Sequence, residues 1–251
     1  MQIEAEDHLW IARAEDAAAM SDKRYTPVCI GFLTPHQKNV IQTNVRPPAD
    51  VRFLFFGGYD AAERTLLISY PDFIQPEPSD YITALEVTGR MVQQLSHRDY
   101  LGSLLGLGLK REKIGDILPF DQKAIVFVWP EIAGYIIENL TKVGNCGVQA
   151  ERIALTDVAI PKRAAVLLEG TVSSLRLDCI LAFALGMSRS KASALIQAER
   201  VTCNFEKAVS VSLLLQEGDL LSVRGFGRYR LAQIGGRTRK DKLHITVERF
   251  L

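Results

Sequence analysis

The apolar residues of positions 172–251 change their period, and this change limits the folds open to the chain. They first recur at helical spacing, at Leu177, Ile180, Leu181, Ala184 and Leu185. Gly186 then supplies a helix stop, and Ser188 is suited to cap a second helix. From Val201 onward apolar and polar residues alternate, which is the period of a half-buried strand. We therefore predict two helices followed by strands.

The charge of the chain is divided unevenly along its length. The net charge is +1, but residues 1–171 hold 17 Lys and Arg against 22 Asp and Glu, a balance of −5. Residues 172–251 hold 13 against 7, a balance of +6. A compact segment with this excess favours a polyanionic partner such as nucleic acid. The alternative is a charge-balanced protein whose basic part contacts its acidic part.

A cluster of prolines divides the region before these helices. Residues 71–78 contain three prolines, which disfavour regular structure and mark a domain boundary. The first domain, residues 1–75, is predicted to be α+β. Its expected elements are a helix at 5–20 and strands at 28–33, 51–56 and 66–70.

Residues 76–165 form the second predicted domain. Its elements are, in order, a strand at 82–87, a helix at 89–95, a glycine-punctuated stretch, a strand at 124–128, a helix at 131–143 and a strand at 148–154. Strands that alternate with two helices are typical of the ferredoxin-like sandwich of the RNA-recognition-motif type. With a third domain at 172–251, the predicted fold class is α+β with three small domains.

The basic residues of the third domain occupy positions that favour an anionic ligand over an ordinary solvated surface. Arg189 and Lys191 lie in the first turn of the second helix, where the helix dipole disfavours cations but backbone amides attract phosphate. If residues 220–231 form one strand, its face opposite the apolar residues carries Arg224, Phe226, Arg228 and Arg230. The glycines at 225 and 227 can introduce a bulge that breaks this parity. A glycine-led loop with Arg237, Arg239 and Lys240 extends the same surface.

Ordered blocks of residues in this domain resemble the S-four-type RNA-binding domain, named after a small-subunit ribosomal protein. The blocks are Leu175-Arg176-Leu177-Asp178, Ser188-Arg189-Ser190-Lys191-Ala192, Leu195-Ile196, Asn204, Gly218-Asp219 and Ser222-Val223-Arg224-Gly225. The resemblance implies the αL RNA-binding fold and an RNA surface on the helix pair and adjacent sheet, with Arg176 and Arg189 as important contacts. The complete set of predicted RNA-binding residues is Arg176, Ser188, Arg189, Ser190, Lys191, Asn204, Arg224, Phe226, Arg228, Arg230, Arg237, Arg239 and Lys240.

Motifs along nearly the whole chain are similar to those of the bacterial YlmH family. They are Gly57-Gly58-Tyr59, Ala62-Glu63-Arg64, His97 to Gly102, Gly106-Leu107-Gly108, Lys110 to Asp116 and Ser222 to Arg228. The resemblance implies rRNA and tRNA binding on stalled large ribosomal subunits, in support of C-terminal alanine tailing during ribosome-associated quality control. It also implies an association with cell division. We expect a monomer and no membrane partner.

The enzyme-like motifs of the chain are incomplete. His97-Arg98-Asp99 mimics a kinase catalytic loop, but Leu104 stands where that loop needs asparagine. The central glycines lack the Lys-Ser/Thr end of a phosphate loop, so a turn or close helix packing is expected there. Lys110, Arg111 and Lys113, beside His97 and Arg98, are a candidate second RNA contact against the alternative of a solvated helix.

Arg176-Leu177-Asp178 is similar to the catalytic triplet of pseudouridine synthases, but here it opens the binding domain, so we interpret Asp178 as a helix-start residue. The four histidines and four cysteines lack the spacing of metal ligands or of a nucleophile with its base. We therefore expect no catalytic residues, metal or cofactor, and a soluble cytoplasmic protein, because the N-terminus has no basic targeting region. An RNA-modifying enzyme of the pseudouridine-synthase type and a cell-division scaffold remain as alternatives.

Overall fold

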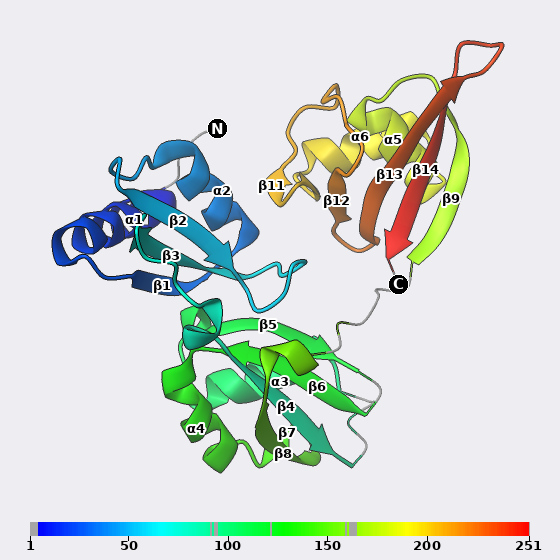
Figure 1. Ribbon diagram of the computed structural model, residues 1–251. Helices are drawn as coiled ribbons and strands as arrows, with labels where there is room; N and C mark the ends of the chain where they lie inside the picture. Colours follow the sequence, from blue (N-terminus) through cyan, green and yellow to red (C-terminus); the bar gives the residue numbers. More distant parts are fainter. Residues whose placement is uncertain are drawn as a thin grey trace. The chain divides into compact units, whose positions relative to one another are not determined.

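The computed structural model of the chain describes residues 5–90, 92, 95–120, 122–158, 160 and 165–250. The chain forms two compact units, residues 1–161 and 162–251, and each is described by itself (Figure 1). The N-terminal unit contains two separate sheets. The division of the chain into three domains stays a prediction.

The first sheet of the N-terminal unit has three antiparallel strands in the order β1-β3-β2. Its elements are α1 (Ala5–Arg24), β1 (Val28–Leu33), α2 (Pro35–Asn44), β2 (Val51–Phe56) and β3 (Thr65–Pro71). Both helices cover one face of the sheet, where Trp10 and Ala14 of α1 and Ile41 of α2 pack on Leu33 and Leu67. The helix and three strands predicted for residues 1–75 are therefore present.

The sequence prediction missed helix α2. Thr34 caps this helix by accepting a hydrogen bond from the backbone N–H of Gln37 at 3.2 Å, and the Gln37 side chain accepts one from the Thr34 N–H at 2.8 Å. Pro35 occupies the first turn, where its missing N–H carries no penalty. This capping box, Thr34 followed by Gln37, is the sequence signal that would have identified the helix.

The second sheet has five strands in the order β5-β6-β4-β8-β7. The elements are β4 (Thr83–Gly89), α3 (His97–Gly106), β5 (Ile114–Pro119), β6 (Lys123–Val128), α4 (Pro130–Asn139), β7 (Lys142–Val143) and β8 (Cys146–Ile153), with 3-10 turns at Pro78–Asp80, Arg111–Lys113 and Leu155–Asp157. Without the two-residue β7, this is the βαββαβ order of the ferredoxin-like sandwich, of whose four strands the sequence predicted three. Helices α3 and α4 pack on one face of the sheet.

Some predicted boundaries in this sheet differ from the structure. Of the helix predicted at 89–95, Gly89 ends β4 and residues 91, 93 and 94 lie outside the described residues. The helix is instead α3, which includes two of the three glycines predicted to form a turn or close packing. Strand β5 was missed because Asp116 interrupts its short apolar pattern.

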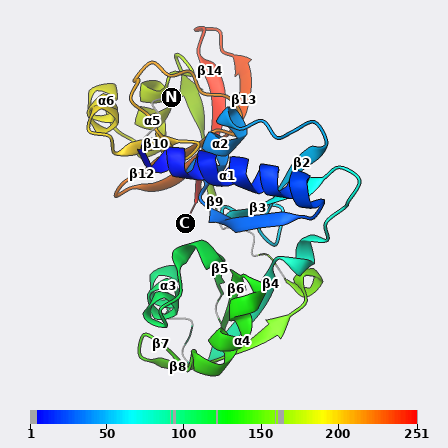
Figure 2. The same cartoon turned by 90° about the vertical axis from the view of Figure 1, so that its left-hand side faces the viewer.

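Part of the second face of the five-stranded sheet is buried against the three-stranded sheet. Ala84, Ile125 and Phe127 project from this face and are at most 1% exposed, packed with Phe32 and Leu66 of the first sheet. The N-terminal unit is thus layered as α1 and α2, three strands, five strands, and α3 and α4 (Figures 1 and 2). Farther along the same face, Gln149 and Glu151 of β8 pair with Thr88 and Glu86 of β4 and are exposed, so this face is only partly covered.

Asp116 is the polar joint between these two sheets. Its buried carboxylate accepts hydrogen bonds from the Tyr59 hydroxyl at 2.8 Å and from the backbone N–H groups of Glu63 and Arg64 at 2.7 and 3.1 Å. The Arg64 guanidinium donates in turn to the carbonyls of Phe32 at 2.6 Å and Ile114 at 3.2 Å. Burial lowers the pKa of Arg64 to about 10, so it remains charged at neutral pH. Residues of the YlmH-like motifs therefore serve to join the layers.

The C-terminal unit is a six-stranded antiparallel sheet in the order β11-β10-β12-β13-β14-β9, with two helices on one face. Its elements are β9 (Ala165–Val172), α5 (Leu177–Leu185), α6 (Arg189–Gln197), β10 (Val201–Cys203), β11 (Glu206–Lys207), β12 (Leu220–Val223), β13 (Gly227–Arg237) and β14 (Leu243–Phe250). The predicted apolar face of α5 packs on the inward residues of these strands.

Two features of this unit differ from the sequence prediction. Strand β9 precedes the expected start of the domain at Val172, yet it pairs along β14 from Val172 opposite Leu243 to Ala165 opposite Phe250. The single strand considered at 220–231 does not form, and the alternative, a break at the glycines, holds. A turn at 224–226 separates β12 from β13, with Gly225 and Gly227 both at positive φ.

Gly58 provides a test of the joint between the two sheets. It has a φ of +100°, and an added Cβ would lie 2.3 Å from the Phe127 ring. We expect Gly58→Ala to lower the free energy of unfolding by about 3 kcal/mol, because it combines backbone strain with overpacking. Urea unfolding of the full chain measures this change. Gly147→Ala is the control, since a Cβ there meets nothing within 4 Å; equal stability of the two variants contradicts the assignment.

Candidate nucleic-acid interface

Two predicted RNA-binding arginines meet at the starts of the two helices of the C-terminal unit. Arg176 precedes the first residue of α5, and Arg189 is the first residue of α6. Between them lies Asp178, in the first turn of α5, whose side chain is 5% exposed. Arg189 donates from Nε and Nη2 to Oδ2 at 3.2 and 2.6 Å, and Arg176 donates from Nε to Oδ1 at 3.1 Å. We call these three residues the Arg-Asp-Arg cluster.

The electrostatics of the Arg-Asp-Arg cluster favour the charged forms of Asp178 and Arg189. Burial of the Asp178 carboxyl opposes its ionisation, but hydrogen bonds from Arg189 and Arg176 outweigh burial, and the pKa of Asp178 is lowered. The hydrogen bond to Asp178 raises the pKa of Arg189. The cluster therefore carries two positive charges and one negative charge. The anion that the sequence argument expected beside Arg189 is supplied in part by the protein itself.

The two helix starts differ in their access to a ligand. At α5, the N–H groups of Leu177 and Asp178 donate to the carbonyls of Leu213 and Val211 at 2.8 and 3.2 Å, so a loop of the same unit already covers them. At α6, the Ser188 side chain accepts only from the Lys191 N–H, at 3.3 Å. The start of α6 therefore retains N–H donors for a phosphate.

The predicted residues in the first turn of α6 lie beside Arg189. Ser188, Ser190 and Lys191 are all exposed. Ser188 is the N-cap, as the sequence predicted, and the Lys191 ammonium has no ion-pair partner among the described residues. These side chains and the Arg-Asp-Arg cluster form one continuous candidate surface.

The structure gives Asn204 a role within the fold. Asn204 has a φ of 50°, its side-chain N–H donates to Asp219 at 2.8 Å, and its side-chain oxygen accepts from the Leu220 N–H at 3.0 Å. It therefore fixes the turn after β10 against the start of β12. Contact of Asn204 with RNA stays a prediction.

The basic residues of 224–230 do not share one face as predicted. Arg224 and Phe226 are exposed in the turn between β12 and β13. Arg228 and Arg230 alternate with the inward Tyr229 along β13, so their side chains leave the sheet on the face opposite α5 and α6. They therefore lie on a different side of the sheet from the helices.

Arg230 is already engaged on this outer face. Its Nε donates to Glu248 of β14 at 2.8 Å, and its guanidinium lies 5.7 Å from the centre of the Phe250 ring. The row of guanidinium groups predicted to grip phosphates is therefore partly neutralised. Its role in RNA binding stays a prediction.

Arg237, Arg239 and Lys240 lie at the far end of β13 from Arg224. Arg237 ends the strand and pairs with Asp241 at 2.5 Å, while the other two are exposed in the turn before β14. Strand β13 spans eleven residues, so roughly 30 Å of strand separates the two groups. The structure thus divides the predicted residues among the helix starts and the two ends of β13.

Arg200 belongs with the turn between β12 and β13 but was missed by the sequence analysis. Its side chain donates from Nη2 to the Arg224 carbonyl at 2.9 Å, and its own carbonyl accepts from the Arg224 N–H at 2.9 Å. It ties the end of α6 to the turn that carries Phe226. The sequence feature that could have identified Arg200 is its place as a basic residue between the second predicted helix and the strand that starts at Val201.

The second basic group, in the N-terminal unit, is only partly available. Arg111 donates to the carbonyls of Ile114 and Gly115, and Lys113 forms an ion pair with Glu131. Arg98 and Lys110 remain exposed. The apolar part of the sheet face on which RNA-recognition motifs stack bases is buried here under the first sheet, while Gln149 and Glu151 on the same face are exposed.

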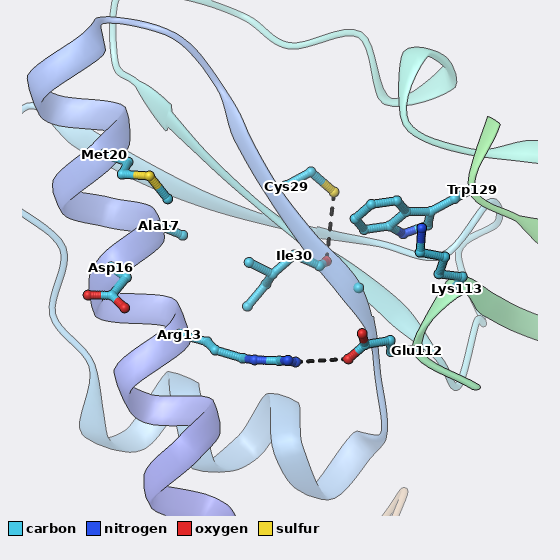
Figure 3. A pocket seen from close by; sticks show the side chains of 10 residues that line it. Arg13, Asp16, Ala17, Met20, Cys29, Ile30, Glu112, Lys113 and Trp129 are labelled. Carbon is cyan, nitrogen blue, oxygen red and sulfur yellow. Dashed lines mark hydrogen bonds and ion pairs between the residues drawn. The ribbon is translucent and has the colours of Figure 1, made fainter. Parts of the chain in front are cut away.

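A cavity of about 290 Å³ lies between α1, β1 and the segment that ends at Trp129 (Figure 3). Arg13 and Glu112 face each other across it and form an ion pair at 2.8 Å (Figure 3). Cys29 lines the cavity, and burial raises the pKa of its thiol to about 12, so this thiol stays protonated. The cavity belongs to the joint between the layers and does not present an activated nucleophile.

Among the described residues, no group of three or more His, Cys, Asp or Glu side chains is arranged to hold a metal ion. In the same part of the chain, no single helix is long and apolar enough to cross a membrane.

Comparisons with known proteins agree with the motifs. A family model described as "Putative RNA-binding domain in YlmH" matches residues 76–157, which contain the five-stranded sheet. A Bacillus subtilis (strain 168) protein named "Ribosome-associated protein quality control protein P2" is 37% identical over 246 residues, 97% of this chain and 95% of that protein. A solved structure, "Cell division protein ylmH from Streptococcus pneumoniae", matches with a TM-score of 0.54 and 21% identity, over 62% of this chain and 96% of that chain. At this identity the likeness shows the fold alone.

Asn204 and Ser190 distinguish a residue that holds the fold from one available to a ligand. We expect Asn204→Ala to lower the free energy of unfolding by about 2 kcal/mol, because it removes two hydrogen bonds and strains a left-handed backbone. Ser190→Ala, on an exposed helix turn, should change stability by less than about 0.5 kcal/mol. Urea unfolding measures both. If Asn204→Ala leaves stability unchanged but weakens RNA binding, Asn204 contacts RNA and does not stabilise the turn.

Proposed function

Because this chain belongs to the YlmH family, we propose that it is a non-catalytic RNA-binding protein that acts on the ribosome. The observation that carries the proposal is the Arg-Asp-Arg cluster beside the open start of α6. It presents two guanidinium groups, each outside the core, on a part of the chain whose charge balance is +6. Guanidinium groups and helix N-termini are both used to bind phosphate.

The mode of binding follows from the distribution of these groups. Phosphate contacts from Arg and Lys give affinity and register, while shape and stacking provide selectivity for folded RNA. Phe226, exposed beside Arg224, is the candidate stacking residue. We propose that the C-terminal unit supplies most of the RNA contacts, since it carries the Arg-Asp-Arg cluster and the apolar part of the outer face of the central sheet is covered.

The ribosomal setting rests on the similarity to the Bacillus subtilis protein, whose name places it in ribosome-associated quality control. We propose that this chain binds rRNA and tRNA on stalled large subunits and supports alanine tailing there. A cytoplasmic location and a monomeric state belong to the same proposal.

The alternative of an RNA-modifying enzyme would use the first two predicted domains for catalysis, and the triplet around Asp178 is its one motif similar to pseudouridine synthases. In the structure two arginines bind both carboxylate oxygens of Asp178, and the side chain is 5% exposed. This arrangement favours a binding role. Mass spectrometry of RNA after incubation with the protein tests the point, and a new modification would favour the enzyme.

The cell-division alternative would be supported by pull-downs of a protein partner that survive nuclease treatment.

The proposed RNA surface is tested by removing both arginines of the cluster. We expect Arg176→Ala with Arg189→Ala to abolish co-sedimentation with ribosomes at about 0.15 M salt, because two phosphate contacts are lost. In direct RNA binding, each lost contact should reduce the salt slope by about one.

The matched control is Arg24→Ala with Arg90→Ala, which removes the same charge from exposed positions of the N-terminal unit. We expect this control to co-sediment nearly as the unaltered chain does. Equal loss of binding in the two double variants would show that net charge alone, and not this surface, holds the ribosome.

A further inference from the structure

We propose that Asp178 is a positioning residue for RNA binding, whose carboxylate holds Arg176 and Arg189 in the orientation in which they meet phosphate. The proposal rests on the proposed function, because it assigns a role within the same surface. It departs from the sequence interpretation of Asp178 as a helix-start residue alone. Asp178 does lie in the first turn of α5, but its side chain serves a second purpose.

The first argument is the rigidity of the Asp178 carboxylate. Its residue lies on a helix whose first turn is fixed by the loop carbonyls of Val211 and Leu213. Its side chain is 5% exposed, whereas those of Arg176 and Arg189 are 37% and 55% exposed. A buried acceptor on a rigid element thus holds two mobile cations that belong to different segments.

The second argument is the number of N–H donors that Arg176 and Arg189 still have free for a ligand. A guanidinium carries five N–H donors. Each arginine directs Nε and Nη2 to Asp178, the Arg176 Nη2 contact being the longest at 3.5 Å, so the inner edges of both are occupied. Neither Nη1 group has a hydrogen-bond partner within the part of the chain that the structure describes. The free edges therefore remain for a ligand, and their orientation is set before the ligand arrives.

Prior orientation matters because free arginine side chains lose considerable rotamer entropy when a phosphate immobilises them. A guanidinium already held by a carboxylate loses less. The negative charge of Asp178 opposes a polyanion, so its presence between two phosphate-binding cations needs a compensating benefit. We infer that orientation is that benefit.

The sign of one substitution separates this proposal from simple electrostatics. Asp178→Asn removes a negative charge beside the RNA surface, which by charge alone strengthens binding to a polyanion. If Asp178 positions the arginines, the same substitution weakens binding. We expect full-length Asp178→Asn to bind purified ribosomal RNA about tenfold more weakly at constant salt.

The charge-matched control is Glu199→Gln. Glu199 is exposed and pairs with Lys207 at 3.3 Å in the same unit, so the substitution makes the same change in net charge away from the cluster. We expect its affinity to equal or slightly exceed that of the unaltered chain, within about twofold. Thermal unfolding of each variant establishes that it is folded.

A second variant avoids altering the buried residue. Arg189→Lys keeps the positive charge on an exposed side chain but removes the planar fork that binds Asp178 and phosphate together. We expect it to weaken RNA binding nearly as much as Arg189→Ala. In the Asp178→Asn background, Arg189→Ala should add little further loss, because coupled residues are not additive.

Tighter binding by Asp178→Asn, or full affinity of Arg189→Lys, overturns the positioning role. Should Asp178→Asn unfold, the comparison of Arg189→Lys with Arg189→Ala decides alone. If neither Arg176→Ala nor Arg189→Ala weakens RNA binding, the proposed surface itself is wrong, and that result is distinct from the failure of positioning.

Discussion

The ion pairs around Asp178 unite the two helix starts of the C-terminal unit, and the candidate interface depends on them. A carboxylate that is nearly buried is stable only when its charge is compensated, and here two guanidinium groups from separate segments compensate it. Each arginine is thereby fixed at its inner edge and exposed at its outer edge. A single requirement of the fold, satisfying a buried charge, thus also arranges the groups that face solvent.

The same principle limits the rest of the basic surface. Arg230 is paired with Glu248, and Arg237 with Asp241. Arg111 satisfies backbone carbonyls. Basic composition therefore overstates the number of cations available to a polyanion, since acids and carbonyls of the fold already hold several of them. The open start of α6, with Ser190 and Lys191, is the region where cations and backbone donors remain together.

The sequence predicted most elements of the fold, and its failures have identifiable physical causes. The two helices after Leu177 and the final strand followed directly from their apolar periods. The strand considered at 220–231 does not form because Gly225 and Gly227 adopt positive φ and turn the chain. Strand β9 was missed because its hydrogen-bonding partner, β14, lies far along the chain. Without that pairing, the pattern of residues 165–172 does not identify a strand.

The candidate site was predicted in its residue types and not in its grouping. Arg176 and Arg189 followed from the blocks of the resemblance, but spacing alone could not reveal that Asp178 joins them. The face of Arg228 and Arg230 depended on the position of one turn. Asn204 was among the residues of the resemblance, but its side chain is used in hydrogen bonds to Asp219 and Leu220 that fix its own turn. Local patterns identify the chemistry of a side chain, whereas its availability depends on tertiary partners.

The buried face of the five-stranded sheet has a practical consequence for dissecting the protein. Residues 76–157, the span of the matched family model, end at a boundary that omits the covering strands. A fragment cut there would expose the side chains of Ile125 and Phe127, with their neighbours, to water. Contiguous apolar surface of this kind promotes self-association and indiscriminate adhesion. Binding measured with such a fragment would come from this exposed apolar face. Residues 1–75 and the central sheet should therefore be kept as one piece.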